Sequence, residues 1–162
     1  MIRAVGLISL LFLSFCARAQ QGAAKQEVPD NPAPHPAPQQ PIPFSHKMHF
    51  GLGLACQQCH ANPEPGAQMT LPDTRTCRTC HTETPQTTPW VRVYQLTPGV
   101  TWTHRRHLQA GMQCVMCHGN VAQFDAMAQT TAVLAMASCI SCHQGHKANT
   151  ECQTCHAWPR SE

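Results

Sequence analysis

The chain has 162 residues, of which 42% are hydrophobic and only 6% aromatic, with 14 prolines, 11 cysteines and a formal net charge of +3. This length is normally one domain, and so few large apolar side chains undersupply the usual hydrophobic core. Lysine and arginine are scattered along the chain instead of clustered, which argues against nucleic acid as a partner.

Residues 1–19 have the pattern of a secretory signal peptide. The basic start MIR precedes the apolar run AVGLISLLFLSFC, and Ala17-Arg18-Ala19 is an A-x-A cleavage site. The run is about 13 residues long, too short to span a bilayer comfortably. We therefore expect a periplasmic or otherwise exported protein with no membrane span in its mature form. The weaker alternatives are an uncleaved anchor and lipidation of Cys16, where the preceding Phe15 is bulkier than lipoprotein signals allow.

Residues 20–43 are predicted to be a proline-rich linker. Positions 29–43 read PDNPAPHPAPQQPIP, and seven prolines in fifteen residues exclude a helix or a central strand. His35 lies within this segment and is interpreted as a solvated linker histidine. The folded part is expected to begin near Phe44.

All ten cysteines after Cys16 fall into five CxxCH units. CxxCH is the attachment sequence of c-type haem: the two thiols bond to the porphyrin vinyl groups, and the histidine that follows becomes the proximal iron ligand. The sequence therefore predicts five covalent haems with their iron. The thiols are Cys56, Cys59, Cys77, Cys80, Cys114, Cys117, Cys139, Cys142, Cys152 and Cys155, and the proximal ligands are His60, His81, His118, His143 and His156.

Three other interpretations of paired cysteines fit less well. A zinc ribbon uses CxxC pairs but needs no histidine directly after each of them. A thioredoxin-like motif has one CxxC on a βαβ unit, which this sequence lacks. A disulfide scaffold would vary its spacings, whereas all five units here are the same.

The chain also contains an internal duplication with a period of 58 residues. FSHKMHFGLGLACQQCH (44–60) aligns without a gap with WTHRRHLQAGMQCVMCH (102–118). Each copy carries an HxxH pair, and residues three apart on a helical turn project side by side. One pair could therefore serve two different irons.

The histidine count matches full axial coordination. Five irons with proximal histidines need five more ligands, and five histidines remain outside the linker: His46, His49, His104, His107 and His146. The four HxxH positions are the firmer assignments. His146 is a lone residue in HQGHK, and its possible substitutes are Met112, Met116, Met136 and Lys147, although methionines more often fill gaps in a core.

These motifs resemble the multihaem class III cytochromes c, the cytochrome c7 and c3 group, in which F-x-H-x-x-H precedes CxxCH. The order of HxxH, two CxxCH, a W-x-R-V run, HxxH and three CxxCH is most similar to small pentahaem cytochromes, such as the pentahaem subunit of alternative complex III. The stretch CHGNVAQFDAMAQTTAVLAMASCISCH also looks like that group.

The resemblance implies which histidine faces which haem. His46 would ligate the haem on Cys56/Cys59, and His104 the one on Cys114/Cys117. His49 and His107 would serve the haems on Cys77/Cys80 and Cys139/Cys142. That leaves His146 for the haem on Cys152/Cys155.

The fold class expected is mostly irregular and α: a small multihaem cytochrome with short helices and loops wrapped around five haems. Residues 44–89 would form a two-haem half and residues 90–162 a three-haem half. One longer helix is predicted over Val121–Ala137, and the segment Trp90–Val100 is expected to be extended. Since porphyrin faces replace the core, the chain without haem is predicted to be largely unfolded.

Irons with two histidine ligands leave no open position, so the sequence predicts a one-electron carrier of low potential and not an enzyme. The redox partners would be proteins, free or in a membrane quinol-oxidising or reductase complex. If His146 is not a ligand, the alternative is a reductase acting on nitrite, hydroxylamine or peroxide at the Cys152/Cys155 haem. Arg105 and Arg106 either pair with haem propionates or form a solvated face.

Overall fold

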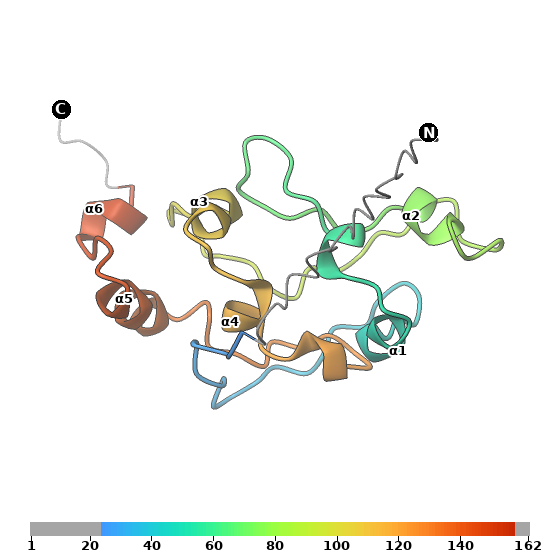
Figure 1. Ribbon diagram of the computed structural model, residues 1–162, viewed down its shortest axis with the longest axis horizontal. Coiled ribbons are helices and arrows are strands. Elements are labelled where there is room, and N and C mark those ends of the chain that lie inside the picture. Colours follow the sequence, from blue (N-terminus) through green and yellow to red (C-terminus); the bar gives the residue numbers. More distant parts are fainter. Residues whose placement is uncertain (1–23, 158–162) are drawn as a thin grey trace, which may run out of the picture.

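The computed structural model describes residues 24–157 (Figure 1). The expected signal peptide, residues 1–19, lies outside the described residues. Within the described part the chain forms short helices joined by long irregular segments, with no strand. The predicted fold class is therefore confirmed. The elements are α1 (His46–Gly51), η1 (Cys56–Gln58), α2 (Thr74–Arg78), α3 (His104–Gln109), α4 (Cys114–His118), η2 (Val121–Gln123), α5 (Met136–Gly145) and α6 (Cys152–Cys155), where η marks a 3-10 turn.

The helices coincide with the motifs, because a short turn forms at every CxxCH and at both HxxH pairs. Side-chain caps start three of these helices. Ser45, Asp73 and Thr103 each accept a hydrogen bond from the backbone N–H three residues later, at 3.2, 3.0 and 3.3 Å. The duplicated helices α1 and α3 are each followed by a glycine in the left-handed region, Gly53 at φ 82° and Gly111 at φ 86°. Both turns are thus limited to six residues by the same local signals.

The helix predicted over Val121–Ala137 is wrong. Only the 3-10 turn η2 forms there, and the chain then stays irregular until α5 begins at Met136. The backbone from 130 to 132 is instead paired with the N-terminal segment: the Asn31 N–H donates to Thr130 O at 2.8 Å, and the Ala132 N–H donates to Pro29 O at 2.9 Å. Thr131 between them is fully buried and donates its hydroxyl to Cys117 O at 2.7 Å. These tertiary hydrogen bonds outweigh the helical pattern of the sequence.

Part of the proline-rich segment packs on the fold. The backbone N–H groups of Glu27 and Val28 both donate to Met116 O at 3.0 Å, and Asp30 forms an isolated antiparallel bridge with Thr131. Val28 is 6% exposed, and no other hydrophobic residue of the described chain is as deeply buried. Residues 24–32 therefore belong to the packed structure, whereas His35 is exposed as expected.

A conventional hydrophobic core is missing from the described residues. Apart from Val28, the buried side chains are the polar Thr74, Thr131 and Ser138. A chain of this size normally buries well over half of the surface that its unfolded form exposes. Packing between apolar side chains cannot supply the stability of this fold, which agrees with a core built around haem.

The helices follow one another along the longest axis of the molecule (Figure 1). Helix α2 lies at one end and α6 at the other, with α1, α4 and α3 between them and α5 next to α6. The segment Trp90–Val100 contains no helix or strand, apart from a bridge between Val100 and His156. It returns the chain from α2 to the start of α3 and so connects the two expected halves.

Candidate haem-binding sites

The five CxxCH units are numbered here in chain order. Site 1 is Cys56–His60, site 2 is Cys77–His81, site 3 is Cys114–His118, site 4 is Cys139–His143 and site 5 is Cys152–His156.

The duplicated segments adopt the same local geometry. In the first copy Phe44 stacks on His49 with ring centres 4.4 Å apart and meets His46 edge-on at 5.0 Å. In the second copy Trp102 stacks on His107 at 5.0 Å and meets His104 edge-on at 4.2 Å. One aromatic ring therefore positions both imidazoles of each HxxH pair, and the two imidazoles point in different directions.

Three of these histidines face the histidine of a CxxCH unit. The ring centres of His49 and His81 are 6.2 Å apart, those of His107 and His143 are 6.2 Å apart, and those of His104 and His118 are 6.5 Å apart. Two imidazoles that bind one metal through Nε2, each at about 2 Å, have ring centres about 6 Å apart. All three separations therefore leave room for an iron between the rings.

The fourth HxxH histidine lies near site 1. Burial lowers the pKa of His46, and the nearby rings of His60 and His49 lower it further. His46 Nδ1 is buried and has no hydrogen-bond partner among the described residues. The effect of His60 on the pKa of His46 indicates that the two rings lie near each other at site 1.

Backbone carbonyls orient five of the ten predicted histidine ligands through Nδ1. The acceptors are Ser45 O for His49 (2.8 Å), Thr70 O for His60 (2.8 Å), Ala67 O for His104 (2.9 Å), Thr103 O for His107 (2.9 Å) and Asn149 O for His143 (2.6 Å). A hydrogen bond at Nδ1 fixes the tautomer that presents an unprotonated Nε2 to a metal. Five of the predicted ligands are therefore already set for coordination.

The electrostatic environment favours neutral imidazoles. Burial, with the neighbouring rings of His104 and His60, lowers the pKa of His118 to about 4. Burial also lowers the pKa of His104. Metal coordination requires the neutral form, so site 3 carries both of its histidines in the state that binds iron at neutral pH.

His146 is the exception among the predicted ligands. Its Nε2, the atom that would bind iron, lies 2.7 Å from Oε2 of Glu27. Glu27 belongs to the N-terminal segment, and the same carboxylate oxygen lies 3.8 Å from the Cys142 thiol. The structure thus brings together the expected partners of sites 2, 3 and 4, whereas it places His146 against a carboxylate.

The thiols are all free and lie at the surface or partly buried, open to covalent attachment. Burial raises the pKa of Cys117 to about 11, and it also raises the pKa of Cys59, Cys139 and Cys142. Between sites 1 and 3 the Cys56 and Cys114 thiols interact, which raises the pKa of Cys56 and lowers that of Cys114. The donor set of paired thiols, proximal imidazoles and facing imidazoles fits a c-type haem at sites 2, 3 and 4, and at site 1 with His46.

Some contacting residues were not identified from the sequence. Phe44 and Trp102 begin the two copies of the repeat, but the sequence does not predict that their rings hold the histidines. Tyr94 packs edge-on against His118 with ring centres 4.8 Å apart, and Glu27 pairs with His146. Only the aromatic residue two positions before each HxxH left a signal in the sequence.

Arg105 does not extend into solvent. It forms an ion pair with Glu64, and its side chain packs over Gly66. Arg106 is exposed. The two arginines therefore have different environments, although they are adjacent in the sequence.

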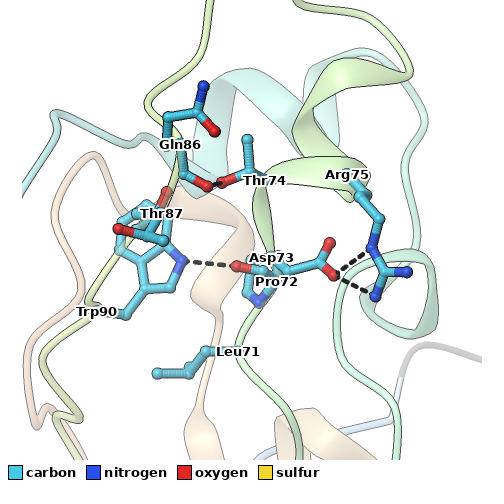
Figure 2. Close-up of a pocket in the computed structure, with 9 residues that line it drawn as sticks. Leu71, Pro72, Asp73, Thr74, Arg75, Gln86, Thr87 and Trp90 are labelled. Carbon is cyan, nitrogen blue, oxygen red and sulfur yellow. Dashed lines mark hydrogen bonds and ion pairs between the residues drawn. The ribbon is translucent and has the colours of Figure 1, made fainter.

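A separate cavity of about 350 Å³ lies beside α2 (Figure 2). Two hydrogen bonds join its lining residues: Trp90 Nε1 donates to Pro72 O at 2.8 Å, and Thr74 Oγ1 donates to Gln86 O at 3.1 Å (Figure 2). Arg75 also forms an ion pair with Asp73. No histidine or cysteine lines it, so it is not one of the haem sites. The lining residues are Leu71, Pro72, Asp73, Thr74, Arg75, Gln86, Thr87, Thr88 and Trp90.

Comparison with known proteins gives two family matches. Residues 21–97 match the model described as class III cytochrome C family, and residues 100–157 match the model described as cytochrome c7 and related cytochrome c. The boundary between the matches falls in the segment that joins site 2 to α3. No curated protein sequence matches the chain.

Proposed function

Because the chain belongs to the multihaem class III cytochromes c, which transfer electrons through several haems, we propose that it holds five covalent haems and carries electrons, one at a time, between redox proteins. The main support is that three histidine pairs face each other with ring centres 6.2–6.5 Å apart: His49–His81, His104–His118 and His107–His143. An iron with two imidazole ligands has no position left for a substrate.

The residues have distinct roles in this proposal. The ten cysteines from Cys56 to Cys155 tether the porphyrins, and the histidine after each pair is the proximal ligand. His46, His49, His104 and His107 are the distal ligands of sites 1, 2, 3 and 4. Bound haem iron supplies a one-electron couple, and two imidazole ligands favour a lower potential than a histidine–methionine pair.

The backbone carbonyls and aromatic rings preorganise this ligand set. The carbonyl acceptors hold each Nδ1–H, and Phe44 and Trp102 limit the rotation of their imidazoles. Ligands that stay in place in both oxidation states keep the structural change on electron transfer small. This is the property that a carrier needs, whereas an enzyme needs a ligand that leaves.

Site 5 supports a second candidate function. We assign His146 as the distal ligand of site 5 by resemblance. To bind iron, however, the Nε2 of His146 has to break its contact with Glu27. If that contact persists, the fifth iron has an open position and the protein is a reductase of a small oxidised substrate such as nitrite, hydroxylamine or peroxide. Turnover of these substrates by the reduced protein, abolished by cyanide, would favour this function.

We also propose that the mature protein is periplasmic and begins after Ala19. Cytochromes of the c7 type are generally exported to that compartment. Within the part of the chain that the structure describes, no helix is both long and apolar enough to cross a membrane. The partners would be redox proteins, either free or part of a membrane quinol-oxidising complex. Recovery of the chain with a detergent-extracted complex would identify the second arrangement, and recovery alone in the periplasmic fraction the first.

The proposed function is tested by counting haems and examining their spin state. Protein produced with the haem-attachment machinery is expected to carry five haems per chain by mass spectrometry and to have a low-spin spectrum in both oxidation states. It should take up about five electrons in a reductive titration. Fewer haems, or a high-spin fraction of about one fifth or more, would contradict five bis-histidine sites.

A further inference from the structure

Helix α1 makes sites 1 and 2 neighbours. Its two histidines are three residues apart: His49 faces His81 of site 2, and His46 is close enough to His60 of site 1 for that ring to lower its pKa. The thiols agree with this, since Cys77 is near enough to raise the pKa of Cys59. Two sites that share one helical turn are adjacent in space.

Helix α3 joins sites 3 and 4 in the same way. His104 faces His118 of site 3, and His107 faces His143 of site 4. Cys117 of site 3 is also close enough to Cys142 and Cys139 of site 4 for their charges to affect it.

The loop of residues 61–70 connects site 1 to site 3. Within this loop Thr70 O accepts from His60 of site 1 at 2.8 Å, and Ala67 O accepts from His104 of site 3 at 2.9 Å. The Cys56 and Cys114 thiols also interact across this boundary, since each shifts the pKa of the other. No facing pair or thiol contact of the described residues joins site 2 directly to site 3, 4 or 5.

Sites 4 and 5 are linked by consecutive helices. Only residues 146–151 separate α5 from α6, and Cys155 is near enough to raise the pKa of Cys139. In Figure 1 α6 lies beside α5 at one end of the long axis, and α2 lies at the other. Cys80 of site 2 and Cys152 of site 5 are the two exposed cysteines of the described chain, and the other eight are partly buried.

From these contacts we propose that the five haem sites form one line in the spatial order 2–1–3–4–5, and that electrons enter and leave the protein at its two ends, sites 2 and 5. This inference rests on the proposed function. One electron leaves a donor protein, which is oxidised, and one electron passes from the opposite end to an acceptor protein, which is reduced. Sites 1 and 2 are exchanged in this spatial order relative to their order in the sequence.

The order is tested by proton NMR of the fully reduced, diamagnetic protein. Each haem is assigned through nuclear Overhauser contacts to the β protons of its own cysteines, and contacts between haems are then recorded. We expect contacts for the pairs 2–1, 1–3, 3–4 and 4–5 and for no others. A contact of site 2 with site 3, or of site 5 with site 1 or 2, would overturn the linear order, as would the absence of a contact between sites 1 and 3.

The ends are tested on the same sample with a soluble gadolinium chelate, which broadens signals near the surface. The haem signals of sites 2 and 5 should broaden most. Greatest broadening at site 1, 3 or 4 would overturn the assignment of the ends. A haem count by mass spectrometry is made first, so that a failure of the proposed function can be told from a failure of the spatial order. A missing haem would contradict the proposed five haems, and the contacts among the remaining haems would still test the order.

Discussion

Replacing His107 by alanine tests whether the facing pairs are axial ligands. His107 faces His143 at 6.2 Å, and its Nδ1 is fixed on Thr103 O. The variant removes one imidazole and leaves the iron of site 4 five-coordinate when reduced. Carbon monoxide binds a vacant position on ferrous haem, so the reduced variant should bind about one molecule per chain, with a change in the Soret band of about one haem in five.

The matched control is His35→Ala, because His35 is exposed in the proline-rich segment. It should bind no carbon monoxide. His107→Met is a second variant that keeps a ligand: it should also bind none and should raise the potential of one haem, as methionine does in place of histidine. A fully haem-loaded His107→Ala protein that stays low-spin and binds no carbon monoxide would refute the assignment of His107.

The remaining predictions concern packing, acid and haem. Gly66→Ala would place a Cβ 2.6 Å from the Cβ of Arg105 at φ 88°, whereas Gly53→Ala has a similar φ of 82° but open space around the new Cβ. Denaturant unfolding should therefore show that Gly66→Ala lowers the free energy of unfolding by about 1–3 kcal/mol. Gly53→Ala should lose less, because it carries only the backbone strain. Burial lowers the pKa of His118 from an ordinary 6.5 to about 4, and iron ligation would hold the same neutral form, so unfolding of the haem-loaded protein takes up a proton at this residue. Its stability against denaturant should therefore fall as pH decreases from about 6.5 to 4, and a flat profile would argue against a neutral His118. The chain produced without haem attachment should show no cooperative thermal transition by circular dichroism, and a sharp transition would mean that the polypeptide folds by its own packing.

The sequence predicted the sites better than the segments between them. CxxCH and HxxH are local patterns whose spacing determines the chemistry, and the gapless repeat of Phe44–His60 at Trp102–His118 is reproduced in the stacking of Phe44 and Trp102 on their histidines. The pairing of His49 with His81 came from the resemblance to a family. Spacing alone does not determine it, because those residues are brought together by the whole fold.

The failures occurred where distant segments compete with local preference. The pattern over residues 121–137 suggested a helix, but Thr130 and Ala132 bond to the N-terminal segment instead. Composition also gave no sign that Val28 would be buried or that Glu27 would meet His146. Such contacts join residues 88 to 119 positions apart, and the sequence of one segment carries no periodic signal for them.

The central claim is that all five irons have two protein ligands, and adding carbon monoxide to the reduced, fully haem-loaded wild-type protein tests it most directly. The account predicts an unchanged Soret band, with His146 having left Glu27 for the iron of site 5. A shift equal to about one haem in five would contradict it, and if His146→Ala did not increase that shift, the open iron would be the one on Cys152 and Cys155.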